Sequence, residues 1–396
     1  MSKNSVSLLL KNKENDAGEK VEVFHSFCPY RVCPLGAHVD HQLGLVTGFA
    51  LDIGTNFDYI ATDDGSIEVY SENYDGEAVG SIHEENERQY IWADYLFGAI
   101  NTLKKSYNIT KGLKGIVSGF VLGGGLSSSA SVILTYLKAL ARVNDINLAS
   151  PELINLAIDE ERSYIGVNVG KLDQSCEVYC KKNHLLYLDT KTDTTKLIPF
   201  SKDMQDFEIA VIFSGVERKL AGSAYNTRVD ECKAASYALK DFAHLEYGKF
   251  ADSYLRDVPR GIFQQYRDKL PHTWEKRAEH FYEENERVKK GIQAFQKGNL
   301  IEFGKLVFES GRSSIQKYET GSPELKTLHE ILEKTDGVYG GRFSGAGFNG
   351  CAMALVDPAK KTEIEIFIQR EYLKVFPNLK NSFRIQFCKT ADGIGQ

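Results

Sequence analysis

The segment V-L-G-G-G-L-S-S-S-A-S, residues 121 to 131, decides how the rest of the chain is interpreted. Its three consecutive glycines free the backbone from Cβ sterics and allow the backbone N–H groups to converge. Three serines follow, and then apolar residues at helical spacing. A glycine-rich turn that leads into a helix combines free N–H donors with the positive end of the helix dipole, and this combination binds anions. We therefore expect nucleotide phosphate here, with one serine left for Mg2+. The residues concerned are Gly123, Gly124, Gly125, Leu126, Ser127, Ser128, Ser129 and Ala130.

Two common phosphate-binding patterns do not fit this segment. A Walker A loop ends in Gly-Lys-Ser/Thr, which is absent, and the dinucleotide fingerprint spaces its glycines, which are contiguous here. A plain strand-to-helix turn with a serine N-cap is the alternative interpretation. It leaves most of the three glycines and three serines unexplained, so phosphate binding is favoured.

Composition limits the function further. The chain has 396 residues, enough for two domains, and its net charge of −6 and lack of a basic run argue against general nucleic-acid binding. No apolar run approaches the roughly 18 residues of a membrane span, and the charged N-terminus is unlike a secretory signal. Seven scattered cysteines are typical of free thiols in a reducing cytosol. We expect a cytoplasmic protein with small-molecule partners; the sequence leaves the oligomeric state open, with a monomer favoured.

The expected helices and strands place the polar clusters. Strands are predicted at 20–25, 57–62, 67–71 and 116–122, and a helix at 92–107. Residues 27 to 52 are rich in proline and glycine and read as a loop, yet they carry several polar side chains, which indicates a site. Residues 228 to 311 read as mostly helical, 340 to 356 as a glycine-rich loop and a strand, 360 to 372 as a helix, and 383 to 388 as the last strand.

A helix is predicted from Ser150, as N-cap, to about Tyr164. Its apolar stripe continues into Glu161, whereas Asp159 and Glu160 should turn away from it. A carboxylate on an apolar face needs a cationic partner. Periodicity alone leaves open whether the partner of Glu161 is a metal ion or a Lys or Arg side chain.

Three stretches together resemble the GHMP small-molecule kinases, and within them the galactokinases. They are P-Y-R-V-C-P-L-G-A-H-V-D-H-Q at 29–42, the glycine-serine segment, and G-R-F-S-G-A-G-F-N-G-C at 341–351, which occur in the family's order over most of the chain. The resemblance implies a two-domain α+β fold with the active site between the domains. We place the boundary between residues 205 and 206. It also implies a kinase that uses ATP and Mg2+.

The resemblance assigns roles to individual residues. Asp173 matches the catalytic aspartate and Arg31 the arginine beside it, while Ser129 and Glu161 match the magnesium ligands. Gly345 and Gly347 belong to the third motif, which shapes the floor near the transferred phosphate. The positions that match sugar contacts are Ala37, His38, Asp40, Gly170, Lys171 and Tyr225. The implied reaction is phosphorylation of the anomeric hydroxyl of a galacto-configured sugar.

The first motif departs from galactokinases at Ala37, where they carry a glutamate that accepts a hydrogen bond from the C6 hydroxyl of the sugar. His41 and Gln42 also replace the family's Tyr-Asn, and the whole stretch resembles the plant galacturonokinases. A glutamate about 4 Å from a C6 carboxylate would cost roughly 4 kcal/mol at an effective dielectric of 20. Its loss favours D-galacturonate as substrate, with D-galactose as the alternative. The cations that could face a C6 carboxylate are Lys171, Arg218, Lys219 and Arg228.

Other interpretations are weaker. An inactive sugar sensor would not need Ser129, Glu161 and Asp173, all of which are present. A mevalonate or homoserine kinase would not need the first motif. A metal site in H-V-D-H is disfavoured because alternation on an extended chain places His41 opposite His38 and Asp40. A zinc site at Cys176 and Cys180 lacks a second pair of ligands.

Overall fold

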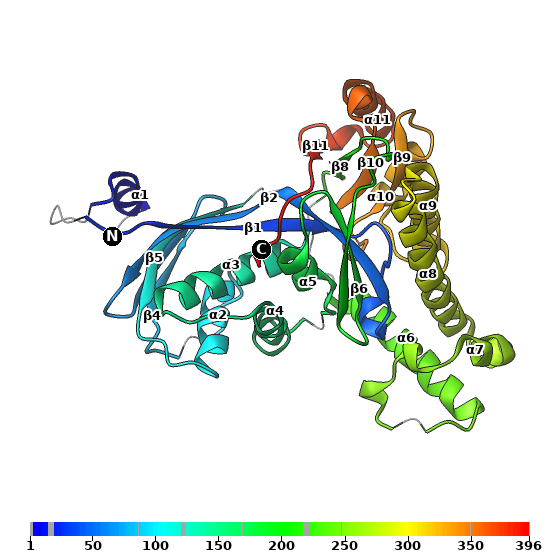
Figure 1. Cartoon of the computed structure of the whole chain (residues 1–396), viewed down its shortest axis with the longest axis horizontal. Coiled ribbons are helices and arrows are strands. Elements are labelled where there is room, and N and C mark those ends of the chain that lie inside the picture. The colour runs from blue at the N-terminus through cyan, green and yellow to red at the C-terminus, as the bar shows by residue number, and fades with distance from the viewer. Residues whose placement is uncertain are drawn as a thin grey trace.

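The computed structural model describes residues 3–14, 20–85, 87–119, 124–167, 169–216, 222–246, 248–348 and 350–395. It is an α+β protein with two sheets, each covered by its own helices (Figure 1). The predicted fold class is confirmed. No helix in the described ranges is long and apolar enough to cross a membrane.

The larger sheet belongs to the N-terminal half. Its strand order is β4-β3-β5-β2-β6-β7, and β1 pairs with β2 beside this path. All pairs are antiparallel except β3 with β5. The strands are β1 (Phe24–Val32), β2 (Leu45–Thr62), β3 (Ser66–Ser71), β4 (Glu77–Ser81), β5 (Gly112–Gly119), β6 (His184–Asp189) and β7 (Thr194–Pro199).

Except for α1 (Lys3–Asn12), which Figure 1 shows above the sheet, the helices of this half pack against one face of the sheet, below it in the picture. Their apolar sides form a core with buried residues of β1, β2, β3 and β5. The helices of this half are α1 (Lys3–Asn12), α2 (Asp94–Lys104), α3 (Ser128–Val143), α4 (Ser150–Asp159), the π-helical turn η2 (Glu160–Ile165) and α5 (Leu172–Tyr179).

The smaller sheet belongs to the C-terminal half and has the strand order β11-β8-β10-β9. Its strands are β8 (Glu208–Phe213), β9 (Val338–Phe343), β10 (Cys351–Val356) and β11 (Arg384–Cys388). The helices are α6 (Gly222–Phe242), α7 (Arg260–Tyr266), α8 (His272–Gln296), α9 (Leu300–Gln316), α10 (Pro323–Leu332) and α11 (Lys361–Val375). The turn between β7 and β8 contains residue 205, and the domain boundary placed there stays a prediction.

The two halves share a hydrophobic core. One buried cluster joins Tyr30, Phe49 and Leu126 of the N-terminal half to Phe213 and Phe295 of the C-terminal half. In addition, residues 389 to 395 run back from β11 to the N-terminal half, where the amides of Gly393 and Ile394 donate to the carbonyls of Cys180 and Glu177, at 2.7 and 2.8 Å. Figure 1 shows this segment in red, ending near α5. Both halves therefore fix the position of α5.

Several local expectations need correction. The strand expected at 20–25 begins only at Phe24 and continues through Pro29 to Val32, so the 27–52 stretch contains most of β1 and the start of β2. Proline is disfavoured inside a β-sheet because it has no N–H to donate, but Pro29 is tolerated in β1 because it lies at a register shift of the ladder. The N-cap of α4 is Ala149, not Ser150, which lies inside the helix. The helices expected at 92–107 and 360–372 are confirmed as α2 and α11.

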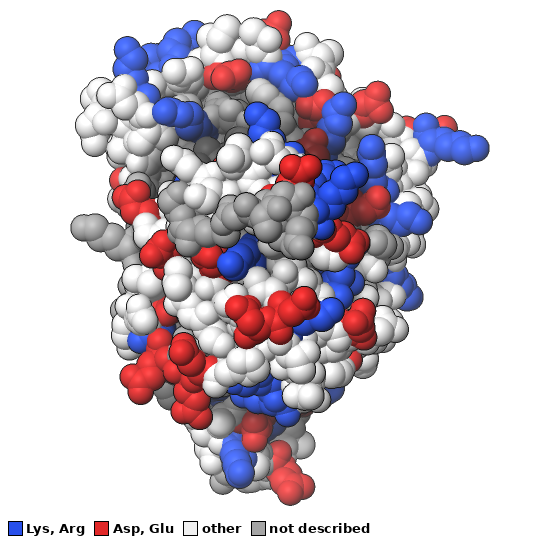
Figure 2. All heavy atoms as spheres, turned by 90° about the vertical axis from the view of Figure 1, so that its left-hand side faces the viewer, with Lys and Arg blue, Asp and Glu red and all other residues white. Residues whose placement is uncertain are grey.

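Surface charge agrees with the low net charge of the chain. Figure 2 shows basic and acidic side chains interspersed over much of the face that it draws. All seven cysteines are buried free thiols. Cys176 and Cys180 have no third metal-ligating partner in the part of the chain that the structure describes.

Candidate active site

The glycine-serine segment leads into α3 as expected. Gly124 and Gly125 have φ of 90° and 99°, in the left-handed region that glycine adopts most readily. Gly123 lies outside the described residues. Ser127 is the N-cap of α3 with φ of 66°, but its side chain makes no capping hydrogen bond. Its hydroxyl instead donates to Asp173 Oδ2 at 2.8 Å, so at least one serine does more than end a helix.

The other residues of the segment divide by exposure. Leu126 and Ala130 are buried, and the Leu126 carbonyl accepts a hydrogen bond from the Arg31 amide at 3.2 Å. Ser128 is exposed in the first turn of α3. The apolar members thus anchor the segment on β1 while a hydroxyl stays accessible.

The third motif packs directly on this loop from the C-terminal half. Ser344 Oγ donates to the Gly125 carbonyl at 2.7 Å. A Cβ on Gly345 would lie 2.9 Å from Gly125 Cα, and one on Gly347 would lie 2.4 Å from the Phe343 ring. Glycine is required where two backbones approach this closely. The two glycine-rich stretches, more than 200 residues apart, therefore form one surface.

Arg31 and Asp173 form the central ion pair. Arg31, on β1, donates from Nε and Nη2 to Asp173 Oδ1 at 2.8 and 2.6 Å, and from Nη1 to the Gly125 carbonyl at 3.0 Å. Burial alone would lower the arginine pKa, but the charge of Asp173 raises it, so the guanidinium stays ionised. The Arg31 side chain is 6% exposed and that of Asp173 is 29% exposed. One side of the carboxylate is therefore open to a substrate.

A second carboxylate lies nearby. Ser129 Oγ donates to Glu161 Oε1 at 2.9 Å, and Gln174 Nε2 donates to Glu161 Oε2. Burial, and then the charge of Asp173, raise the pKa of Glu161 to about 7. Hydroxyl and carboxylate oxygens are the ligands that Mg2+ prefers. Ser129 and Glu161 therefore fit the metal role assigned to them.

The π-helical turn η2 explains one wrong expectation. Glu160 was expected to turn away from the apolar stripe, yet it is fully buried, and Gly98 is so close that a Cβ there would lie 2.7 Å from its Oε1. The widened i→i+5 turn from Glu160 to Ile165 shifts the helical register at this point. Both Glu160 and Glu161 consequently face inward.

The first motif forms another part of the candidate site. Asp40 lies against Gly170, where a Cβ would be 1.9 Å from its Oδ2. Burial, followed by the charge of Asp173, raises the pKa of Asp40 to about 6. His38 is buried and stacks on Tyr318 with 4.5 Å between ring centroids. Its Nε2 has no hydrogen-bond partner among the described residues. Asp40 thus lies beside Gly170 and close to Asp173, whereas His38 packs among the rings of His280, Tyr318 and Phe343.

The cations expected to face a C6 carboxylate are occupied or outside the described residues. Lys171 Nζ forms an ion pair with Asp193 at 2.7 Å, and Arg228 one with Glu231 at 3.1 Å. Arg218 and Lys219 belong to the part that is not described. Tyr225 is half-buried, and its ring centroid is 6.0 Å from that of His41.

His41 and Gln42 have a structural role that the sequence did not reveal. They lie in a 3₁₀ turn, Asp40 to Gln42, and not on an extended chain. Gln42 Oε1 accepts from the Leu255 amide at 3.0 Å, so its Nε2 is the atom that donates to His41 Nδ1 at 3.2 Å. His41 Nε2 must then donate to the Tyr318 hydroxyl at 2.9 Å. The two residues therefore tie the first motif to the C-terminal half.

Comparison with known proteins now adds to this geometry. The model for the GHMP kinases N terminal domain matches residues 94–181, and the model for GHMP kinases C terminal matches residues 292–374. A galacturonokinase of Arabidopsis thaliana is 34% identical over 399 aligned positions, covering 94% of this chain and 93% of that protein. The chain belongs to the GHMP kinase family.

Other members place this GHMP kinase near the galactokinases. A galactokinase of Limosilactobacillus reuteri is 33% identical, with 86% of this chain and 87% of that protein covered. The crystal structure of Lactococcus lactis galactokinase complexed with galactose superposes with a TM-score of 0.88 at 30% identity, covering 98% of each chain. Mevalonate kinase, at 18% identity and a TM-score of 0.65, shares the fold. The resemblance stated from the three motifs is confirmed.

The structure also adds residues to this kinase's site that the motifs did not single out. Gln174 contacts the Glu161 carboxylate and Ser344 contacts the glycine loop, and Ser344 belongs to the third motif. Glu284, on α8, and Tyr318, just after α9, contact the first motif although they are far from it in sequence. No local pattern marks these last two residues.

Proposed function

We propose that this kinase transfers the γ-phosphoryl group of ATP to the anomeric hydroxyl of a galacto-configured sugar, D-galacturonate. The observation that carries the proposal is the Arg31–Asp173–Ser127 cluster beside the glycine loop, next to a first motif that has Ala37 in place of a carboxylate. The similarity to a galacturonokinase and to galactokinases supports a sugar 1-kinase. Buried free thiols suit a reducing, cytoplasmic setting.

The mechanism follows from the contacts of Asp173. Oδ1 is held by two hydrogen bonds from Arg31 and Oδ2 by one from Ser127, so the carboxylate is fixed in orientation. In this position Asp173 would accept, or at least orient, the proton of the anomeric hydroxyl. Arg31 pairs with the Asp173 carboxylate and could stabilise charge on the transferred phosphoryl group. Phosphoryl transfer depends mostly on such positioning and charge stabilisation.

The nucleotide would lie over the glycine loop. The left-handed glycines and the N-terminus of α3 provide backbone donors for its phosphates. Ser129 and Glu161 would hold Mg2+, which when bound neutralises the β- and γ-phosphate oxygens. Gln174, by fixing Glu161, would keep that carboxylate directed at Ser129.

Sugar recognition rests on the first motif. His38, Asp40 and Gly170 would contact the sugar hydroxyls, and Tyr225 would face the ring. Ala37 itself carries no acidic side chain, so residue 37 adds no like-charge repulsion against a C6 carboxylate. Lys171 could add a positive charge only by leaving Asp193.

A sugar panel tests the proposal. We expect a higher kcat/KM for galacturonate than for galactose, glucuronate, arabinose or N-acetylgalactosamine. In Ala37→Glu the order of galacturonate and galactose should reverse, because about 4 kcal/mol of like-charge repulsion corresponds to roughly a thousandfold loss for galacturonate. A wild-type enzyme that phosphorylates galactose faster would make this chain a galactokinase. If the enzyme turns over none of these sugars with ATP, the alternative of an inactive sugar sensor is favoured.

A further inference from the structure

The backbone of the first motif is held from α8, in the other half of the molecule. Glu284 Oε1 accepts hydrogen bonds from the amides of Gly36 and Ala37 at 2.8 and 3.2 Å, and from Ser310 Oγ at 2.6 Å. One turn earlier on α8, His280 Nε2 contacts the Ala37 carbonyl at 2.9 Å. Both backbone polar groups of Ala37 are therefore bound by side chains of one helix.

Glu284 is fully buried, yet it is ionised. Burial alone raises the pKa of a carboxyl group, but the charges of Arg287, His280 and Arg342 hold the pKa of Glu284 well below its usual range. Arg287 Nε donates to Glu284 Oε2 at 2.7 Å. The bonds to Gly36 and Ala37 are consequently charge-assisted and stronger than neutral ones.

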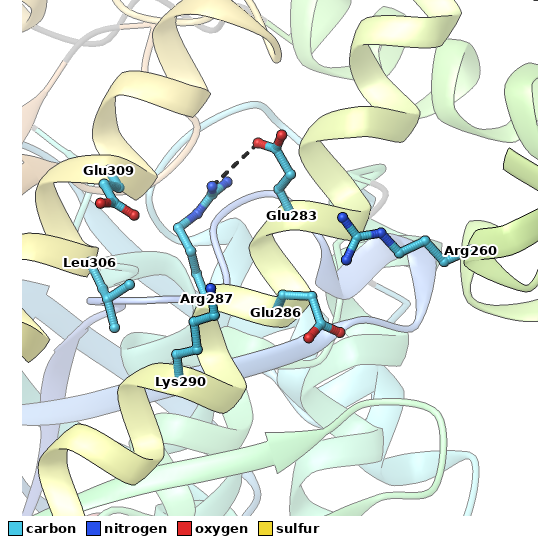
Figure 3. Close-up of a pocket in the computed structure, with 7 residues that line it drawn as sticks. All are labelled: Arg260, Glu283, Glu286, Arg287, Lys290, Leu306 and Glu309. Atoms are coloured by element: carbon cyan, nitrogen blue, oxygen red, sulfur yellow. Dashed lines mark hydrogen bonds and ion pairs between the residues drawn. The ribbon is translucent and has the colours of Figure 1, made fainter. Parts of the chain in front are cut away.

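The ion pair reaches the protein surface through Arg287. Figure 3 shows this arginine extending from α8 toward Glu283, beside a pocket of about 210 Å³ that Arg260 and Lys290 also line. Glu284 itself lies behind the first motif and has no exposed atoms that a substrate could touch. The hydrogen bonds that Glu284 makes to the first motif go to the backbone of Gly36 and Ala37.

We propose that Glu284 is a positioning residue for the sugar, because it fixes the Gly36–Ala37 peptide at the place where the C6 substituent of the substrate would lie. This inference rests on the proposed function, in which the first motif contacts the sugar. It also makes the amides of Gly36 and Ala37 unavailable to the substrate, since both point to Glu284. The side chain of residue 37 and His38 are then the groups of this turn that meet C6.

Glu284→Gln tests the proposal. A glutamine presents one acceptor and one donor, so it cannot satisfy both the two amides and the Arg287 guanidinium. We expect the KM for the sugar to rise by about tenfold to a hundredfold, the range for one lost hydrogen bond to a charged group. The KM for ATP should stay within about twofold, because the hydrogen bonds of Glu284 to described residues go to Gly36, Ala37, Arg287 and Ser310, and none goes to the described part of the glycine loop.

Ser310→Ala is the matched control. It removes a hydrogen bond to the same oxygen of Glu284 but touches no residue of the first motif, so it should lower the melting temperature and leave the sugar KM unchanged. If Glu284→Gln lowers stability without changing the sugar KM, Glu284 is merely structural and the proposal is wrong.

A second variant covers the case in which Glu284→Gln does not fold. Arg287→Lys keeps the charge but loses the Nε bond, and the sugar KM should rise several-fold. An unchanged sugar KM in this variant also contradicts the proposal. All measurements use the sugar with the highest kcat/KM in the panel. Absence of turnover with every sugar would instead refute the proposed function.

Discussion

Substituting Gly170 tests the sugar site with little effect on the nucleotide site. In Gly170→Ala the new Cβ would lie 1.9 Å from Asp40 Oδ2 and 2.4 Å from Asp40 Cγ, whereas real Cβ contacts are not shorter than 3.0 Å. Asp40 cannot move freely, because the amides of His41 and Leu172 donate to its carboxylate. The substitution must therefore displace a pinned carboxylate from its position.

The size of the effect follows from what Asp40 would lose. If the displaced carboxylate no longer reaches a sugar hydroxyl, one hydrogen bond to a charged group is lost, which costs about 1.5 to 3 kcal/mol. The KM for the sugar should rise roughly tenfold to 150-fold. Asp173, three residues further on, keeps its bonds to Arg31 and Ser127, so the KM for ATP should change little.

The assay is steady-state kinetics with the sugar and ATP varied in turn, together with thermal unfolding. Gly261→Ala is the matched control, since no atom lies within 4 Å of the Cβ that it adds on α7. It should leave both KM values unchanged. A Gly170→Ala enzyme with wild-type sugar KM would refute the assignment of Asp40 and Gly170 to the sugar site.

Three further predictions concern other parts of the site. Asp173→Asn should lower kcat by about 10² to 10⁴-fold with nucleotide binding retained in calorimetry, because the amide can keep the contacts to Arg31 and Ser127 but cannot accept a proton; near-normal turnover would contradict the assignment. Gly345→Ala should weaken ATP binding at least tenfold, because its Cβ would lie 2.9 Å from Gly125 Cα and residue 345 has a φ of 71°. Unchanged ATP affinity of the folded variant would exclude the glycine loop as the phosphate site. Burial lowers the pKa of His41 to about 3, against about 6.5 in the unfolded chain. Between these two pH values only the unfolded state binds the proton, so the free energy of unfolding falls by about 1.4 kcal/mol for each pH unit of acidification. The stability advantage of wild type over His41→Gln in urea unfolding should therefore shrink from pH 7 to pH 4, and a constant difference would show that His41 is not held neutral.

The segments that carry chemistry could be predicted because each is short and locally constrained. Three adjacent glycines before an amphipathic stretch require an unusual turn, and the structure places Gly124 and Gly125 at positive φ. The helical stripe that ends in Glu161 pointed to an inward carboxylate, which the structure contains. These inferences needed only neighbouring residues and the periodicity of a helix.

Other features depend on residues far apart in the chain, so no local pattern marks them. The ion pair between Lys171 and Asp193 joins residues on either side of α5 and β6. It engages one of the cations that the sequence suggested as a partner for a C6 carboxylate. Glu284 reads in sequence as one charge among many on α8, whereas it is a buried support of the first motif. The inward turn of Glu160 required the π-helical turn, which helical periodicity does not foresee.

The return of residues 389 to 395 to the N-terminal half has a consequence for how the chain acquires activity during synthesis. Helix α5, which carries Asp173, has eight residues, too few to be stable alone. The carbonyls near its end are bound by Gly393 and Ile394, which leave the ribosome more than 200 residues after Asp173. We therefore expect that a ribosome-bound chain can form most of the larger sheet while α5 still lacks these two hydrogen bonds. We then expect full activity only after residues 389 to 395 have been made.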